Sequence, residues 1–358
     1  MQKKLIALAV ASLVSAPVFA QSQVTVYGTF DAGVRSVDNA NLNGDRQTTM
    51  DSSGTYNSNR WGIKGSEDLG NGMKANFNLE GGFLSGSGQM DDNNTLFRRK
   101  AIVGLSGNWG ALDLGRNYTT IFYTTGAYDP FNYKYTGIIP IAGLDGARRN
   151  NTITYTGAFN GLTVRAMYAL GETVGSGSEG STSEVGASYA NGPFSVGAAY
   201  GVQKSVAVAA KAAVASDLTT TPITLGSAAV AAVPALDTTN WTIGGAYKTG
   251  PFRVALGYDV KEADVNGGGS NDTKVTWVGG SYDITGPMAF TLAYYKTKLD
   301  NKTAADGDKK LWMAGLTYDL SKRTTLYTAI DNTKLDGSYD TGTKDTVTGI
   351  SIGMNHAF

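Results

Sequence analysis

Hydrophobic and polar residues alternate with a period of two along much of the second half of the chain, which is the spacing of β-strands. One face of residues 252–261 carries Phe252, Val254, Leu256, Tyr258 and Val260, and the residues between them form a more polar face. Residues 288–294 and 312–318 repeat the pattern. Short turns containing glycine and longer polar loops follow one another between these segments. The sequence therefore predicts a series of antiparallel strands.

The short turns give the number of strands. They are predicted at seven places, near residues 66–73, 106–110, 157–161, 190–193, 248–251, 283–287 and 319–323. With both chain ends on the same side, these turns predict 16 strands. The ends alternate too, with Val24, Val26 and Phe30 at the start and Ile350 and Ile352 before the terminal Phe358. Because pairing the last strand with the first removes every sheet edge, we expect an all-β, antiparallel, closed barrel.

Alternation alone does not distinguish a membrane barrel from a soluble sandwich whose apolar face points inward. The placement of tyrosines does, because they recur at the short-turn end of the apolar face, as Tyr189, Tyr247, Tyr282 and Tyr318. Membrane barrels have aromatic girdles at the interface, short periplasmic turns and long outer loops. The pattern therefore favours a transmembrane barrel.

The first residues read as a targeting segment. Lys3 and Lys4 precede an apolar run over residues 5–14, and the small-residue ending Val18-Phe19-Ala20 follows. The run is too short to span a membrane and is typical of a secretory signal. We expect residues 1–20 to be a signal peptide and residues 21–358 to form the barrel of an exported protein.

Composition narrows the possible functions. The chain has 47 Gly, 19 Tyr and 8 Pro, which favours strands and turns, and it has no Cys. Its 30 basic and 30 acidic residues balance, so we expect no nucleic-acid partner. The only His is His356, on the last predicted strand, and carboxylates do not cluster at ligand spacing. We therefore expect no enzyme activity, no metal and no cofactor.

Two long connections depart from the repeat. Residues 117–147 are rich in Tyr, Gly and Ile, and we interpret them as a loop folded into the lumen to make a constriction; an ordered loop on the outer surface is the alternative. Residues 206–236 are an insertion rich in Ala and Val, which we expect in an extracellular loop.

Four short segments carry a family resemblance: NRWGIKGSEDLG at residues 59–70, FRRKAIVGL at 97–105, GRNY at 115–118 and RNN at 149–151. In this order, and with a C-terminal Phe, they resemble the Gram-negative general porins, a trimeric 16-stranded family, over essentially the whole mature chain. The resemblance implies an outer-membrane channel for passive diffusion of small hydrophilic solutes and inorganic ions. It also implies a homotrimer in contact with membrane lipid and lipopolysaccharide.

In that family, wall arginines face an acidic inward loop. The match carries this role onto Arg60, Arg99 and Arg149, with Arg116 nearby and Lys64 on the face of Arg60. Strand alternation alone points Arg98 inward instead of Arg99, and we follow the motif.

The loop itself departs from the enteric members of the family. Tyr128-Asp129-Pro130-Phe131 replaces their acidic segment, and Asp129 and Asp145 are the only acids there, with Lys134 opposing them. A net positive constriction predicts weak anion selectivity.

A secreted β-rich adhesin without channel activity is the alternative to the porin interpretation, and it would be soluble without detergent. The Asp91-Asp92-Asn93-Asn94 segment is a solvated loop or, alternatively, a site for divalent ions at the outer surface.

Overall fold

The computed structural model describes residues 23–50, 52–92, 94–135, 147–207, 234, 236–302, 304–340 and 344–358. The predicted signal peptide and most of the 206–236 insertion lie outside these ranges, as do Asp145 and Asn93. Within the described residues no helix is both long and apolar enough to cross a membrane.

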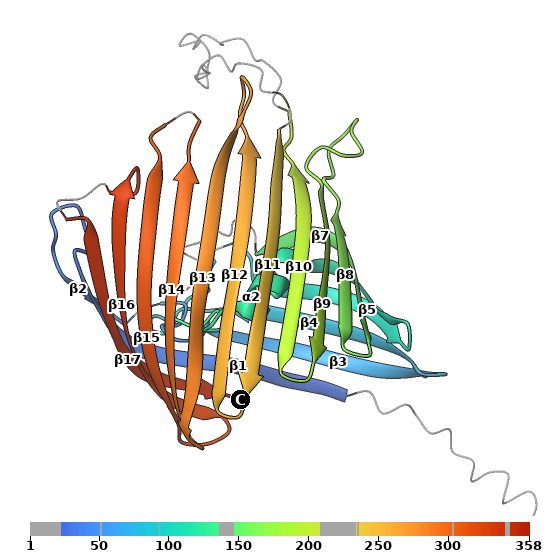
Figure 1. Ribbon diagram of the computed structural model, residues 1–358. Coiled ribbons are helices and arrows are strands. Elements are labelled where there is room, and N and C mark those ends of the chain that lie inside the picture. The colour runs from blue at the N-terminus through green and yellow to red at the C-terminus, as the bar shows by residue number, and fades with distance from the viewer. Residues whose placement is uncertain are drawn as a thin grey trace, which may run out of the picture.

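Antiparallel strands follow one another in sequence order around a single closed sheet (Figure 1). Sixteen are long, and the three-residue strand β2 pairs with β1 beside them. Their bounds are β1 (Gln23–Asp38), β2 (Gln47–Thr49), β3 (Arg60–Gly70), β4 (Met73–Gly82), β5 (Lys100–Gly107), β6 (Gly110–Tyr118), β7 (Arg148–Phe159), β8 (Leu162–Ala169), β9 (Thr182–Asn191), β10 (Phe194–Lys204), β11 (Asp237–Thr249), β12 (Phe252–Asp264), β13 (Ser270–Thr285), β14 (Met288–Asp300), β15 (Gly307–Asp319), β16 (Thr324–Gly337) and β17 (Thr346–Ala357). The predicted 16-stranded antiparallel barrel is confirmed, and each of the seven predicted short turns joins two of these strands.

The first and last strands close the barrel. β1 pairs with β17 from Thr29 opposite Ala357 to Asp38 opposite Thr348, and its other edge pairs with β3. The terminal residue completes the seam, since the N–H of Gly28 donates to the carbonyl of Phe358 at 3.0 Å and the N–H of Phe358 donates to the carbonyl of Gly28 at 3.1 Å. This closure satisfies the backbone groups that an open edge would expose to hydrocarbon.

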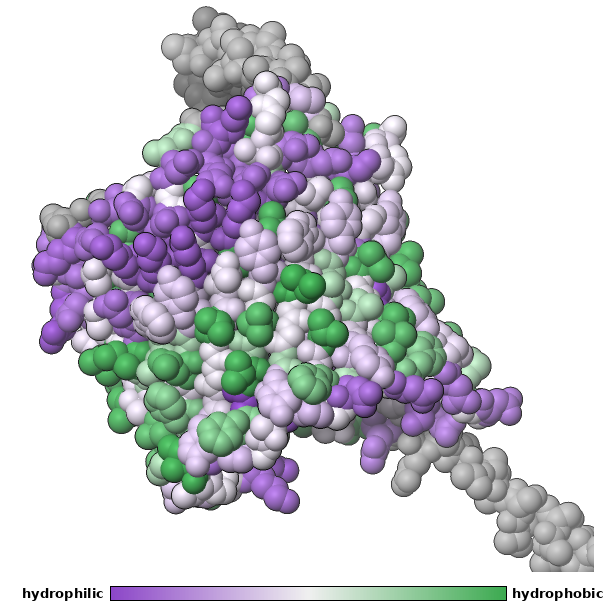
Figure 2. All heavy atoms as spheres, in the orientation of Figure 1, coloured by the Kyte–Doolittle hydropathy of each residue, from purple (hydrophilic) through white to green (hydrophobic). Residues whose placement is uncertain are grey.

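Alternation separates the two surfaces of the sheet. On β1, Val24 and Val26 are 63% and 64% exposed, whereas Asp31 is completely buried. On β17, Ile350 and Ile352 are exposed and Ser351, between them, is buried. Figure 2 shows hydrophobic side chains forming a belt across the outer face. The apolar residues therefore point outward and the polar residues inward, the reverse of a soluble barrel.

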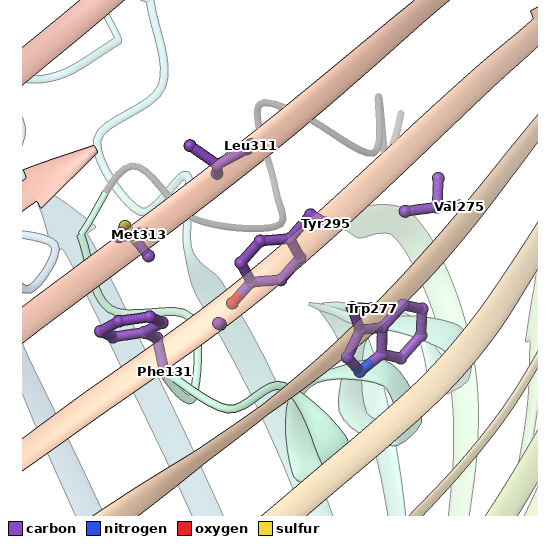
Figure 3. Close-up of a cluster of buried hydrophobic side chains, with 7 residues drawn as sticks. Phe131, Val275, Trp277, Tyr295, Leu311 and Met313 are labelled. Atoms are coloured by element: carbon purple, nitrogen blue, oxygen red, sulfur yellow. The ribbon is translucent and has the colours of Figure 1, made fainter. Parts of the chain in front are cut away.

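The connection between β6 and β7 carries the helix α2 (Thr120–Tyr128). It lies against the inner face of the sheet and contacts β8 to β12 (Figure 1). Beyond the helix, Phe131 packs into a buried cluster on the inward side of β13, β14 and β15, together with Val275, Trp277, Ala293, Tyr295, Leu311 and Met313 (Figure 3). The main apolar cluster of this barrel therefore joins an inner loop to one wall.

Candidate functional site

Hydrogen bonds from one wall hold the end of α2. Trp277 on β13 donates its indole N–H to the carbonyl of Tyr128 at 2.9 Å, and Arg253 on β12 donates to the carbonyl of Ala127 at 2.9 Å. Both side chains point inward, on the face opposite the exposed Val254 and Val278. The last turn of a helix leaves carbonyls without an intrahelical partner, and these two donors satisfy two of them.

The start of α2 is held by a carboxylate from the wall. Glu184 on β9 accepts hydrogen bonds from the N–H groups of Thr120, at 2.6 Å, and Ile121, at 3.2 Å. The Thr119 hydroxyl accepts a further bond from the N–H of Phe122 at 3.1 Å. A negative charge at a helix N-terminus is favourable because the helix dipole is positive there. Both ends of α2 are thus fixed to the barrel.

Small residues on the wall make room for the helix. Gly244 on β11 faces the Tyr128 ring, and a Cβ at Gly244 would lie 2.7 Å from side-chain atoms of Tyr128. On the neighbouring strands, a Cβ at Gly186 would lie 2.7 Å from Thr120, and a Cβ at Gly197 would lie 2.9 Å from Tyr128. The inward glycines of β9 to β11 therefore form the surface on which α2 rests.

Asp129, which follows the helix, does not face the arginines. Its side chain is 0% exposed, and its carboxylate accepts from the Tyr295 hydroxyl at 2.6 Å and from the N–H of Tyr133 at 2.6 Å. Burial raises the pKa of Asp129 above its usual range, although these hydrogen bonds oppose the rise. Asp129 thus anchors the loop to β14.

A group of basic side chains lies on the opposite stretch of wall, around Glu80 and Tyr118. Arg99 forms a buried ion pair with Glu80, with 2.8 Å between Nε and Oε1. The Tyr118 hydroxyl donates to Glu80 at 3.4 Å, and Arg148 donates to the Tyr118 hydroxyl at 3.0 Å. Arg60 lies near enough to interact electrostatically with both Arg99 and Glu80. We call Arg60, Arg99, Lys100 and Arg148 the basic cluster.

Aromatic rings hold several of these cations in place. The Arg148 guanidinium stands 4.4 Å from the centre of the Tyr118 ring, and Arg165 on β8 stands 4.8 Å from that of Tyr123. Lys100 donates to the Tyr123 hydroxyl at 3.1 Å. Cations over ring faces are favourable when partly desolvated. The helix α2 therefore meets the basic cluster through Tyr123.

The structure places the predicted basic site residues at several points along the wall. The structure brings Arg60 and Arg99 together, and it places Lys64 over the Tyr27 ring at 5.1 Å, nearer the short-turn end of β3. Arg149 points inward and donates to Gln203. Arg116 lies apart from them, because it bonds the carbonyl of Arg98 and the side chain of Asn150.

The partners of Arg98 and Arg99 show which of these adjacent arginines belongs to the basic cluster. Arg98 turns to Asp91, with 3.2 Å between Nε and Oδ1, whereas Arg99 is buried beside Glu80. Sequence reasoning missed Lys100, Arg148 and Arg165. Arg148 could have been found because it directly precedes Arg149, but the RNN segment at residues 149–151 pointed only to Arg149.

Comparison with known proteins supplies the family. A model described as Gram-negative porin matches residues 7–338. Outer membrane porin protein 32 of Delftia acidovorans is 37% identical over 220 residues, which are 57% of this chain and 61% of that protein. Major outer membrane protein P.IB of Neisseria meningitidis serogroup A is 34% identical over 212 residues, covering 56% of this chain and 60% of that protein. The chain thus spans about three fifths of the length of the curated relatives it matches.

Solved structures agree over a longer stretch. An anion-selective porin from Comamonas acidovorans superposes with a TM-score of 0.76 and 26% identity, covering 94% of this chain and all of that one. OmpF of Salmonella typhi superposes with a TM-score of 0.65 and 17% identity, covering 94% of this chain and 97% of that one. At 17% identity the second likeness concerns the fold alone.

Proposed function

Because the chain belongs to the Gram-negative porin family, we propose that it forms a water-filled channel through the bacterial outer membrane for passive diffusion of small hydrophilic solutes and ions. The observation that carries this proposal is the inverted barrel, apolar outside and polar inside, with a loop bound along its inner face. Outward apolar side chains match hydrocarbon, and a sheet without edges leaves no backbone group unsatisfied there. The loop between β6 and β7 narrows the passage.

We further propose that the channel prefers anions. Within the described residues, Arg99 is the one member of the basic cluster that forms an ion pair, with Glu80, and Asp129 is removed from the passage by burial. Rings of basic side chains favour anions in pores. The likeness to a porin described as anion-selective also supports a preference for anions. Lys64 and Arg165 add positive charge on the same stretch of wall.

Two partners follow from the family resemblance. The protein forms a homotrimer, and it contacts outer-membrane lipid and lipopolysaccharide. The exposed valines of β1 provide an apolar outer surface for either contact.

Reversal potentials in a salt gradient test the selectivity. In a planar bilayer, the purified protein should give a reversal potential with the sign expected for an anion-selective channel. The double variant Arg60→Glu with Arg148→Glu should shift this potential in the direction of cation selectivity. Arg46→Gln is the matched control, since Arg46 pairs with Asp38 on the exposed outer end of the barrel. Cation preference in the unmodified protein would contradict the selectivity, and a folded, reconstituted protein that conducts no ions would contradict the channel.

A further inference from the structure

The outer surface of β12 to β15 has an apolar hollow. It has a volume of about 440 Å³ and is lined by residues that include Val254, Val278, Gly280, Leu292, Tyr294 and Trp312. Gly280 points outward and has no side chain, while the side chains of the neighbouring strands rise around it. The hollow therefore offers apolar space for part of an acyl chain on a surface that faces lipid.

A row of lysines begins above the edge of the hollow formed by Tyr294 and Trp312, and it runs on to β16. Lys296 on β14 is opposite Lys310 on β15, and Lys310 is opposite Lys334 on β16. All three share the outward face with Trp312, and Lys296 follows Tyr294 by two residues. Figure 2 shows hydrophilic side chains gathered over the upper ends of these strands, above the hydrophobic belt.

The row stands at the outer boundary of the membrane. Trp312 on β15 and Leu320, the residue after this strand, mark the two ends of its apolar outer face, and they span about 26 Å along the chain. With an ordinary strand tilt this is roughly 20 Å across the bilayer. Lys310 is two residues beyond Trp312, so the row lies at the level of lipid headgroups.

Like charges directly opposite one another on a sheet are destabilising. Carboxylates relieve only part of this repulsion, and they lie on the loop side of the row. Lys334 reaches Asp345 at 3.4 Å and Lys296 reaches Asp308 at 4.0 Å. Lys310, at the centre, forms no ion pair within the described part of the chain. The side of the lysine row that faces the membrane can therefore accept another anion.

We propose that β12 to β16 bind one lipopolysaccharide molecule of the outer leaflet, with an acyl chain in the hollow and the phosphates on Lys296, Lys310 and Lys334. The row crosses two strand spacings, roughly 10 Å, which suits a headgroup carrying two phosphates better than the single phosphate of a phospholipid. The site rests on the proposed outer-membrane orientation.

Titration with a fluorescent bisphosphorylated lipid A tests the site on the folded protein in detergent. The variant K296Q/K310Q/K334Q should bind on the order of 10- to 100-fold more weakly. The matched control K74Q/K248Q/K322Q removes three lysines from the short-turn side and should bind as the unmodified protein does. Val278→Phe, which fills the hollow, should also weaken binding.

Three results would overturn the assignment. These are an unchanged affinity in the lysine variant, equal binding of phosphatidylglycerol, and a change of oligomeric state in the lysine variant or in Val278→Phe. Conductance of the same preparations separates this proposal from the channel function. Normal conductance with unaltered lipid A affinity refutes the lipid site alone, whereas an unmodified protein without conductance refutes the channel.

Discussion

Removal of the Tyr295 hydroxyl should release the inner loop from the wall. Tyr295 is completely buried, and its hydroxyl donates to Asp129 at 2.6 Å. Tyr295→Phe keeps the ring, so its packing against Phe131 and Met313 persists and only the hydrogen bond is lost. The carboxylate keeps its hydrogen bonds from the N–H of Tyr133, at 2.6 Å, and from that of Phe131.

The size of the effect depends on the charge of Asp129. A hydrogen bond to an ionised group contributes about 1.5–3 kcal/mol, which corresponds to a roughly 10- to 100-fold larger population of released loop. When Asp129 is protonated, the same bond is between neutral groups and contributes about 1 kcal/mol, or roughly fivefold. The difference between the variant and the unmodified protein should therefore shrink as Asp129 takes up its proton.

The pH dependence of the anchor itself has a definite sign. Burial raises the pKa of Asp129, so the folded protein binds this proton more tightly than the unfolded chain does. The contribution of Asp129 to stability is thus fully present at low pH. It falls as the pH rises from the ordinary pKa of a carboxyl through the raised one. Asp129→Asn, which lacks the titrating group, should remove this dependence.

Current fluctuations in planar bilayers report loop release. At neutral pH, Tyr295→Phe should show more frequent reversible steps than the unmodified protein, with the excess declining towards acid pH. Asp129→Asn should show steps whose frequency does not change with pH over this range. A folded Tyr295→Phe channel as quiet as the unmodified one at neutral pH would refute the anchoring role of the bond.

Two further substitutions test other contacts of the site. Glu80→Gln leaves Arg99 buried without its charged partner and should lower the free energy of unfolding, measured in urea, by about 3–5 kcal/mol. The double variant Glu80→Gln with Arg99→Gln should recover part of this loss. Equal stability of the two variants and the unmodified protein would show that the ion pair contributes nothing. Gly257→Ala places a Cβ 2.0 Å from the Trp277 indole and should displace its hydrogen bond to Tyr128. The resulting current steps should keep the pH dependence that Asp129 confers, and a quiet Gly257→Ala channel would contradict this role of Trp277.

The sequence was sufficient for the barrel because the signals of strands and turns are local. The outward face of β1, with Val24 and Val26, and that of β17, with Ile350 and Ile352, follow from a period of two residues. Turns such as the one at Asn160-Gly161 follow from residues that adopt positive φ, here 49° and 85°. Sixteen strands and their closure could therefore be predicted without any long-range contact.

The site was less predictable because local irregularities break the alternation there. The register shifts between Gly115 and Asn117, where Gly115 has φ of 126°, so that Tyr118 turns inward and Arg116 does not. Asn151 has φ of 56° and interrupts the alternation of β7 in the same way, next to Arg148 and Arg149. Periodicity cannot assign faces across such bulges.

The path of α2 depends on contacts between distant residues. Asp129 and Tyr295 are 166 positions apart, and Trp277 and Tyr128 are 149 apart. The sequence shows an acid in a loop where the family has an acidic segment, which favours exposure. It contains no local sign that a tyrosine on the eighth strand after the loop covers that acid. Burial of Asp129 is therefore visible only in the folded barrel.

The contacts that position the loop and those that supply positive charge come from different parts of the wall. Trp277, Arg253 and Tyr295 bind the backbone or the buried carboxylate of the loop from β12 to β14. Arg60, Arg99 and Arg148 gather around Glu80 and Tyr118 on the earlier strands. A change at Trp277 or Tyr295 alters the width of the passage and leaves its charge, whereas a change in the second group alters the charge at a similar width. Conductance and reversal potential should therefore respond separately, and an anchor variant that shifts the reversal potential as much as an arginine variant would contradict this separation.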